Sequence, residues 1–173
     1  RLQGDWSSDV CSSDLAVGGV RDILVVERGM LASGCTGGSM GGVRQQFGSA
    51  PHVELAKRGR SFWSTFEEVF ERPCPYMQDG YLMVTSREDV LERLVRSAAV
   101  QIETGAPDVE VLAGDQIKEL VSWMSTGDLR GGCWTPLDGR VNPTDGLYGL
   151  AAEARTRGVT FRERFQIGRA SCR

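Results

Sequence analysis

The sequence predicts an α/β fold, namely a partial Rossmann-like nucleotide-binding domain with an inserted α+β region. Two observations support this prediction. Residues 22–27 form a short apolar run that ends in an acid, and a loop crowded with Gly, Ser and Thr follows at 29–48. Strand-like and helix-like patterns then alternate along the chain, as in layered α/β proteins.

The first strand, at 22–27, is continuously apolar before its acid, as expected of a strand buried on both faces of a parallel sheet. In the loop at 29–48 we expect a short helical turn near 40–46. Residues 51–70 predict one amphipathic helix. Its predicted apolar face consists of Leu55, Gly59, Phe62, Phe66, Val69 and Phe70.

The remaining elements follow from strand patterns and from capping residues. Residues 80–85 predict a strand, and Ser86 is expected to cap a helix that ends at a left-handed Gly105. The later elements are a short helix at 114–124, a strand at 131–136, a turn at 137–140, a helix at 143–157 between Asn142 and Gly158, and a strand at 159–163.

The two ends of the chain differ from the rest. Residues 5–15 and 167–173 lack helical or strand periodicity and do not resemble targeting segments. Both reverse-translate without a gap into adapters that are ligated to DNA fragments for sequencing. We therefore interpret 1–15 and 167–173 as non-native, adapter-like segments. The alternative, a natural Ser-rich tail at each end, requires both tails to match by chance.

The remaining residues divide into three predicted segments. Residues 16–72 form the first part of the nucleotide-binding region, 73–140 form the inserted α+β part, and 141–166 continue the nucleotide-binding region. There are no internal repeats and no low-complexity segments.

Bulk properties exclude several classes of protein. The 173 residues are enough for one domain with a core, and the net charge of −3 does not favour nucleic acid or an anionic membrane surface. No apolar run is long enough to span a bilayer. Cys35, Cys74 and Cys133 are far apart and show neither metal-ligand spacing nor a disulfide framework, so we expect a reducing, cytoplasmic compartment and no metal.

Glu27 is the most informative candidate binding residue of the first strand. A carboxylate at the end of such a strand can bind a ribose hydroxyl, and the loop after it offers backbone N–H groups to an anionic cofactor. The alternative is an ordinary polar end to a strand. The usual G-x-G-x-x-G turn should precede Asp22 by about twenty residues. It is absent, and Gly18 and Gly19 are a remnant at best. Under the adapter interpretation, that turn was cut off.

Three motifs carry a family resemblance. These are ERG-x-x-ASG-x-TGGS-x-GG-x-RQQF at 27–47, DGY-x-x-VT at 79–85 and DGRVNP at 138–143. They resemble the amine- and amino-acid-oxidising FAD oxidoreductases, the superfamily of D-amino-acid oxidase, sarcosine oxidase and dimethylglycine dehydrogenase. The resemblance covers nearly all of 16–166 and corresponds to the amino-terminal half of such an enzyme.

The resemblance implies an FAD site, position by position. Glu27 and Arg28 would meet the adenosine ribose, and Gly41 and Gly42 would let the backbone approach the isoalloxazine ring. The residues that would line the pyrophosphate and the ribityl chain are Ala32, Ser33, Thr36, Gly37 and Ser39.

Two further positions bear on the chemistry. Arg44 would lie near the flavin ring or the substrate carboxylate and act as a catalytic residue by favouring negative charge on the reduced flavin. Its alternative role is a surface or structural ion pair. Gly38 stands where dimethylglycine and sarcosine dehydrogenases carry a histidine that binds flavin covalently. We therefore expect non-covalent FAD, or attachment through the missing half.

Other candidates favour structural roles. We expect His52, the only histidine, to be solvated in the first turn of its helix, and Cys35 to be a small apolar filler. Tyr81 opens the predicted strand at 80–85, and its direction is left open. The aromatic residues expected in the core are Phe62, Trp63 and Phe66.

The resemblance implies an enzyme that binds FAD and oxidises a small amine or amino acid of the sarcosine, glycine or D-amino-acid type. Hydride would pass from the carbon next to nitrogen to the flavin, and the imine would hydrolyse. The alternatives are a 2-hydroxy-acid oxidising flavoenzyme and a non-catalytic flavin-binding assembly protein. We expect the 173-residue chain by itself to be inactive.

Overall fold

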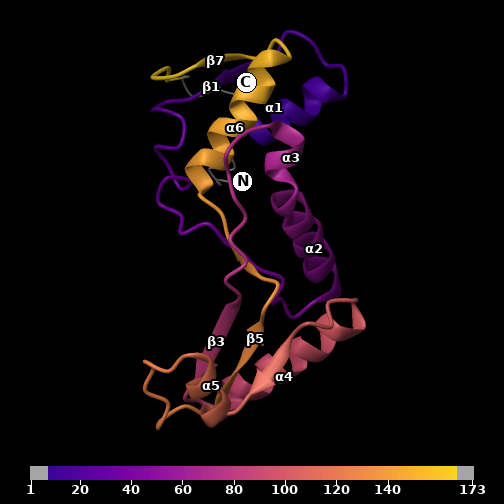
Figure 1. The fold of residues 1–173 in the computed structure, drawn as a ribbon. Coiled ribbons are helices and arrows are strands. Elements are labelled where there is room, and N and C mark those ends of the chain that lie inside the picture. The colour runs from indigo at the N-terminus through magenta and orange to yellow at the C-terminus, as the bar shows by residue number, and fades with distance from the viewer. Residues whose placement is uncertain (1–7, 167–173) are drawn as a thin grey trace, which may run out of the picture. The chain divides into compact units, whose positions relative to one another are not determined.

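The computed structural model describes residues 8–166, and Figure 1 shows their helices and strands. The chain divides into two compact units, each made of separate stretches of sequence. Unit 1 contains the described residues up to Gly41, Phe66–Pro75 and those from Val141 onward. Unit 2 contains Gly42–Thr65 and Tyr76–Arg140.

Unit 1 is built around a parallel strand pair and two packed helices. Strands β1 (Leu24–Val26) and β7 (Thr160–Arg162) pair in parallel, with Val25 opposite Phe161. Helix α1 (Ser8–Val17) packs against α6 (Pro143–Thr156), and the short α3 (Phe66–Phe70) also contacts α6. Ala16, Val25, Ala154 and Val159 form one core cluster of this unit.

The predicted strands at 22–27 and 159–163 are confirmed, but the burial expected of the first is wrong. Val25 is buried against the helices, whereas Leu24 is 53% exposed. Successive side chains of a strand point to opposite faces. The helices of unit 1 therefore cover the face of β1 that carries Val25, and on the opposite face Leu24 is exposed and Val26 is half-buried.

Helix α1 differs from the sequence prediction, which placed no element at 5–15. Ala16 is 5% exposed and packs with Val25 and Ala154, and the helix as a whole contacts α6. Such tertiary packing overrides the weak helix propensity of Ser and Asp. The interpretation of 1–15 as non-native stays a prediction, and residues 167–173 lie outside the described part of the chain.

Unit 2 contains an antiparallel sheet in the order β3-β5-β4, made of Tyr81–Thr85, Gly131–Thr135 and Glu110–Leu112. Figure 1 shows β3 and β5 side by side, and α4 (Glu88–Glu103) packs on β5. Ala98, Val109 and Cys133 form the core between them, and α5 (Gly114–Leu120) contacts β5 as well. The predicted strands at 80–85 and 131–136 are confirmed.

The segment at 42–65 belongs to unit 2, although the sequence assigned it to the nucleotide-binding region at 16–72. Its strand β2 (Gly42–Val43) pairs with β6 (Gly139–Arg140), and its helix α2 (Ala50–Ser64) contacts α4. The helical turn expected near 40–46 is therefore wrong, because residues 42–43 pair as a strand and the residues on either side are not helical.

The helix predicted at 51–70 is two helices, because it is interrupted at Thr65 between α2 and α3. The Thr65 hydroxyl donates to the carbonyl oxygen of Ser61 (3.1 Å), and such bonds compete with the helical ladder. The predicted apolar face is also wrong in α2, where Leu55 is 68% exposed and Val53 is fully buried.

The capping residues agree with the sequence at three of four positions. Gly105 (φ +78°) and Gly158 (φ +88°) are left-handed at helix ends, and Asn142 Oδ1 accepts the N–H of Thr144 (3.0 Å). The cap predicted at Ser86 is wrong. Instead, the hydroxyl of Thr85 accepts the N–H of Arg87 (3.1 Å), and α4 begins after Arg87.

Candidate functional site

The acid at the end of β1 is held by the turn that follows it. Glu27 is half-buried, and its N–H donates to the Arg162 carbonyl oxygen (2.9 Å). Its Oε1 accepts the N–H of Gly29 (2.6 Å), and Arg28 is exposed. Both candidate ribose residues therefore stand at the carboxyl end of a parallel strand, the edge at which α/β sheets bind ligands.

The loop at 30–39 folds as consecutive turns that are anchored at Leu31. Leu31 is buried, its N–H donates to Glu163 Oε1 (2.7 Å), and its carbonyl oxygen accepts the Tyr148 hydroxyl (3.2 Å). The end of β7 and helix α6 therefore hold this loop together. The candidate pyrophosphate and ribityl residues all lie in it: Ser33, Gly37 and Ser39 are exposed, and Ala32 and Thr36 are half-buried.

Two glycines here are required by close backbone approach. A Cβ on Gly37 would overlap with the carbonyl oxygen of Ala32, which itself has a φ of +66°. Gly41 is buried with a φ of +69°, and a Cβ there would overlap with the carbonyl oxygen of Val141. The segment therefore presents small side chains and backbone, a surface that suits a pyrophosphate group.

The candidate residues of unit 2 begin at the other glycine and at Arg44. Gly42 is exposed at the start of β2, where a Cβ would contact the Tyr81 ring at 3.4 Å. The Arg44 guanidinium lies over the rings of Phe47 (5.7 Å) and Tyr81 (5.4 Å). Among residues 13–166, no carboxylate lies within 4.0 Å of Arg44, so the alternative role in an ion pair finds no support there.

A surface pocket of about 240 Å³ lies beside Arg44. One wall is made by residues 42–44 and Phe47, which come from β2 and the segment after it. The other wall is one face of α2, with His52, Leu55, Ala56, Gly59 and Trp63.

Buried side chains hold the backbone next to Arg44. Gln45 and Asp138 are both fully buried, and the Gln45 N–H donates to the two carboxylate oxygens of Asp138 at 3.1 Å each. Gln45 Nε2 donates to Asp108 Oδ1 (2.7 Å), and the other oxygen of Asp108 pairs with Arg60 (3.5 Å). Arg44 therefore extends from a backbone that is fixed by a buried polar network.

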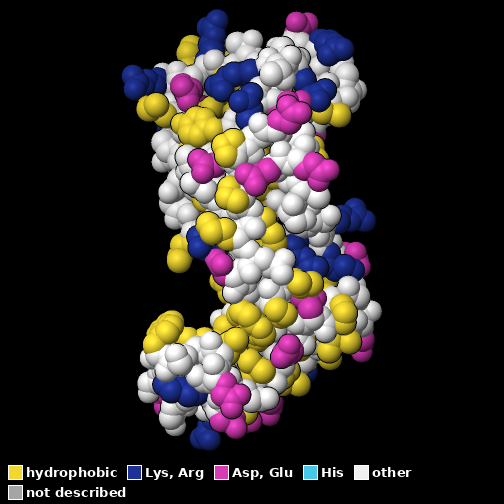
Figure 2. Space-filling model, viewed as in Figure 1, with side chains coloured by type: hydrophobic (Ala, Val, Ile, Leu, Met, Phe, Trp, Pro, Cys, Tyr) yellow, Lys and Arg dark blue, Asp and Glu magenta, His cyan; other side chains and the backbone are white. Residues whose placement is uncertain are grey.

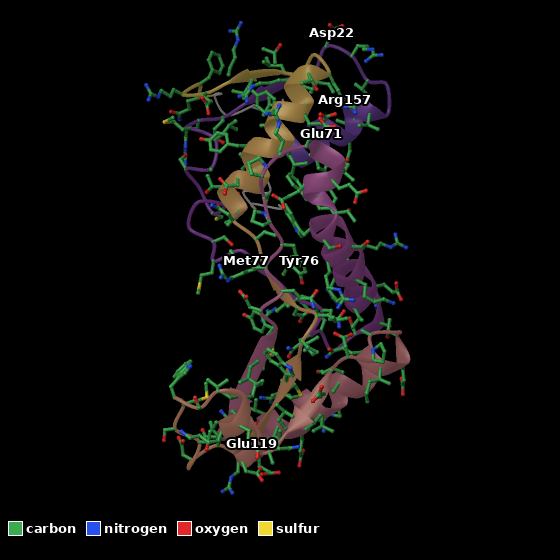
Figure 3. All side chains as sticks on the ribbon, in the orientation of Figure 1. Asp22, Glu71, Tyr76, Met77, Glu119 and Arg157 are labelled. Carbon is green, nitrogen blue, oxygen red and sulfur yellow. The ribbon has the colours of Figure 1, made fainter. Side chains whose placement is uncertain are left out.

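Burial raises the pKa of Asp138 to about 6, because it disfavours the charged carboxylate. The hydrogen bond from the Gln45 N–H and the charge of Arg60 oppose this shift. Burial also raises the pKa of Tyr76 to about 12, with Asp138 as the next cause. The Tyr76 hydroxyl donates to the Leu137 carbonyl oxygen (2.6 Å). Figure 3 labels Tyr76 and the next residue, Met77, which forms an isolated antiparallel β-bridge with Arg140.

The next residue, Gln46, joins the same segment to the sheet. It is 8% exposed, and its Nε2 donates to the Tyr81 carbonyl oxygen (2.6 Å). The side-chain oxygens of Gln45 and Gln46 are buried without a hydrogen-bond partner within the described residues. Both glutamines of RQQF thus point inward, and Arg44 is the exposed member of the motif.

The remaining candidates have mixed outcomes. His52 is exposed in the first turn of α2, as expected, and its Nδ1 shares a hydrogen bond with the Ser49 hydroxyl (2.6 Å). Cys35 is exposed, which does not fit the small apolar filler expected in the loop. Phe66 is fully buried, as expected, but Phe62 is 36% exposed and Trp63 lines the pocket rather than the core.

Sequence reasoning missed two anchors, Asp138 and Glu163. Asp138 was assigned to a turn, although it stands first in the DGRVNP motif, and the motif was the available signal. Glu163 follows the last strand, and no local pattern connects it with Leu31, which lies 132 residues earlier.

The charge distribution of each unit is mixed. Figure 2 shows Lys and Arg side chains interspersed with Asp and Glu over the visible face, without one large basic patch. Within residues 8–166, no helix combines the length and the apolar character needed to cross a membrane. Among the side chains that the structure describes, at 13–166, no group of three or more His, Cys, Asp or Glu is placed to hold a metal ion.

Comparison with known proteins places this geometry in a family. 4-Methylaminobutanoate oxidase (formaldehyde-forming) of Paenarthrobacter nicotinovorans is 28% identical over 153 residues, which cover 88% of this chain and 18% of that protein. The mitochondrial pyruvate dehydrogenase phosphatase regulatory subunit of Mus musculus is 25% identical over 149 residues, which cover 86% of this chain and 17% of that protein. The chain thus spans about a fifth of the length of these relatives.

A solved structure shares the fold. The crystal structure of L-proline dehydrogenase from P. horikoshii matches with a TM-score of 0.80 at 24% identity, over 90% of this chain and 41% of that one. The partial Rossmann-like α/β fold is thereby confirmed. A model of the DAO family of FAD-dependent oxidoreductases matches residues 13–171. The chain therefore belongs to this FAD-dependent family, as its motifs predicted.

Proposed function

We propose that the protein containing this chain oxidises a small amine or amino acid, of the sarcosine, glycine or D-amino-acid type, by hydride transfer to FAD. Arg44 carries this proposal, because its guanidinium forms no ion pair within 4.0 Å among residues 13–166 and borders a largely apolar pocket. The similarity to an oxidase of 4-methylaminobutanoate, itself an amino acid, supports this class of substrate.

The FAD would be held by the residues that the motifs assign. Glu27 and Arg28 would meet the adenosine ribose, and Gly41 and Gly42 would border the ring. Ala32, Ser33, Thr36, Gly37 and Ser39 would line the pyrophosphate and the ribityl chain. The fit is supported by the position of Glu27 at the end of β1 and by the glycines at 37 and 41, where no Cβ has room.

The proposed hydride transfer needs little acid–base catalysis from the residues of this chain. Bound flavin supplies the acceptor for the hydride that leaves the carbon next to nitrogen. Loss of the hydride would leave an iminium ion, or an imine once its N–H proton passes to solvent, and water would hydrolyse it to a carbonyl compound and an amine or ammonia. Arg44 would orient the substrate carboxylate or stabilise negative charge on the ring. The buried bond between Gln45 and Asp138 would keep the Arg44 backbone in place.

We further propose that FAD is not covalently bound at this loop, because Gly38 has no nucleophilic side chain. Acid precipitation of the full-length protein should release the flavin into the supernatant. Flavin that stays with the pellet, and maps to a peptide of 29–41, would contradict this assignment.

A second candidate is a non-catalytic flavin-binding protein. The mouse relative is named as a regulatory subunit, and its similarity extends over 86% of this chain. The family membership of this chain is therefore compatible with a regulatory role as well as with turnover.

Anaerobic mixing of the full-length protein with sarcosine, glycine, D-alanine and a 2-hydroxy acid separates these candidates. We expect the absorbance of oxidised flavin to bleach with one of the amines and to stay unchanged with the 2-hydroxy acid. Bleaching by the 2-hydroxy acid alone favours that substrate class. A flavin that only dithionite reduces favours the non-catalytic protein.

A further inference from the structure

Tyr81, the first residue of β3, lies against the candidate residues at 42–44. Its side chain is half-buried, and the Arg44 guanidinium lies over its ring at 5.4 Å from the centroid. A Cβ built on Gly42 would meet the same ring at 3.4 Å, so the ring also lies close to the start of β2. The direction that the sequence left open for Tyr81 is therefore toward the segment that bears Arg44.

The sheet of unit 2 holds this ring in place. Tyr81 pairs with Thr135 of β5, and its carbonyl oxygen accepts a hydrogen bond from Gln46 Nε2 (2.6 Å). Gln46 is 8% exposed and stands two residues after Arg44. The strand that carries the ring is therefore tied to the segment that carries the guanidinium, which limits how far the two groups can move apart.

Tyr81 and Phe47 both contact Arg44, but they differ in their access to the pocket beside it. Phe47 lines the pocket and stacks on His52 with ring centroids 5.9 Å apart. Tyr81 is not among the residues that line the pocket. Phe47 can therefore contact a molecule in the pocket directly, whereas Tyr81 can act on such a molecule only through Arg44.

We propose that Tyr81 is a positioning residue, whose ring holds the Arg44 guanidinium at the edge of the pocket. A cation is attracted to the face of an aromatic ring, and this contact leaves the N–H donors of the guanidinium free for other partners. A side chain that is already ordered loses less conformational entropy when it binds. The effect on the reaction rests on the proposed function, whereas the contact itself can be tested without turnover.

Chemical modification tests the contact in the full-length holoprotein. Phenylglyoxal attacks accessible guanidinium groups, and peptide mass spectrometry reads its rate at Arg44. Y81L removes the ring and should raise this rate by about two- to fivefold, the factor that corresponds to a cation–π contact at an exposed site. Y81F keeps the ring and should react like the wild type. L82A is the matched control, because Leu82 is half-buried on the same strand and points to the opposite face.

A double-mutant cycle with R44Q tests the effect on the reaction. In anaerobic mixing with the amine that bleaches the flavin, Y81L should slow bleaching by about two- to fivefold when Arg44 is present, and not in the R44Q background. Y81F should restore the wild-type rate. A residue that only supports the fold would slow both backgrounds alike. If Y81L does not fold, Y81I takes its place, since β-branched residues favour strands.

Three results would overturn the inference. These are an unchanged rate of Arg44 modification in folded Y81L, the same acceleration in L82A as in Y81L, and equal slowing of bleaching by Y81L with and without Arg44. Bleaching by an amine together with any of the three removes this inference alone. A flavin that no amine bleaches removes the proposed oxidation alone, and the modification rates then decide whether Tyr81 holds Arg44.

Discussion

The loop at 30–39 in unit 1 and the RQQF segment at 44–47 in unit 2 hold their candidate residues in opposite ways. The loop is anchored at buried Leu31 and exposes small side chains and backbone. RQQF buries Gln45 and Gln46 and exposes one long cation. The loop at 30–39 offers a ligand its backbone, whereas the RQQF segment offers a single side chain. Different substitutions should therefore disrupt the two segments.

We expect the largest loss of stability from a substitution at Gly41 of unit 1, because the backbone there leaves no room for a Cβ. G41A places a Cβ on the Val141 carbonyl oxygen at a φ of +69°, and we expect a loss of about 3–5 kcal/mol of unfolding free energy. Urea denaturation of the full-length protein measures this loss.

G158A is the matched control for the backbone conformation. Gly158 has a φ of +88°, but a Cβ there meets nothing within 4 Å. The dihedral alone should cost about 1–2 kcal/mol. Equal losses for G41A and G158A would show that the approach to Val141 has no energetic role.

The second-largest loss of stability is expected at Leu31, which anchors the loop at 30–39. L31A removes a buried side chain that packs with Leu147 and Ala151, so we expect a loss of about 2–4 kcal/mol and weaker FAD retention. M40A, at a side chain that is 94% exposed in the same stretch, should change the stability by less than about 0.5 kcal/mol. Comparable losses in both variants, measured by urea denaturation, would contradict the anchoring role.

The contribution of the RQQF segment to stability should depend on pH, because its partner Asp138 titrates. The pKa of Asp138 is raised to about 6 in the folded state, so between about pH 4 and 6 the folded chain retains a proton that the unfolded chain releases. Stability from this group is therefore highest below pH 4 and falls as the pH rises to 6, by roughly 2–3 kcal/mol.

The D138N variant isolates this contribution. Its amide oxygen can still accept the Gln45 N–H, but it carries no titrating proton. Unfolding free energies of the wild type and D138N, measured from pH 4 to 7, should therefore converge at the acidic end and diverge toward neutrality. Two parallel curves would show that Asp138 does not titrate in this window.

The smallest effect concerns reactivity rather than stability. Cys35 is exposed in the loop, whereas burial raises the thiol pKa of both Cys74 and Cys133. Because the thiolate is the reactive form, iodoacetamide should modify Cys35 of the apoprotein before Cys74 and Cys133. Peptide mass spectrometry reads the order of modification, and added FAD should slow the reaction at Cys35 but not at Cys74 or Cys133. Faster modification of Cys133 would contradict the packing of β5.

Residue patterns predicted the elements that depend on neighbouring residues, and they missed those that depend on distant contacts. The strand at 80–85 and the helix at 143–157 follow from residue periodicity and from Asn142 and Gly158, and both are present. Strand β2 was missed because it contains two residues, and its partner at 139–140 lies almost a hundred residues away. The interruption at Thr65 depends on hydroxyl bonds that periodicity does not report.

The same distinction applies to the candidate site. Motifs identified the loop residues and Arg44, because glycine spacing and residue type are visible in the sequence. They did not identify Asp138 as the partner of Gln45, since that contact joins positions 93 residues apart. Nor did they indicate that α2 turns Trp63 and Gly59 toward a pocket, because helical spacing alone does not say which side of a helix is covered.

The parallel pairing of β1 with β7 has a consequence for synthesis on the ribosome. Leu24 pairs opposite Thr160, so unit 1 cannot close its sheet until the last of these residues has been translated. Unit 2 is complete as soon as Arg140 has emerged. We therefore expect unit 2 to become protease-resistant first in stalled nascent chains. Until translation reaches β7, strand β1 lacks its parallel partner, and an unpaired strand edge is prone to aggregation.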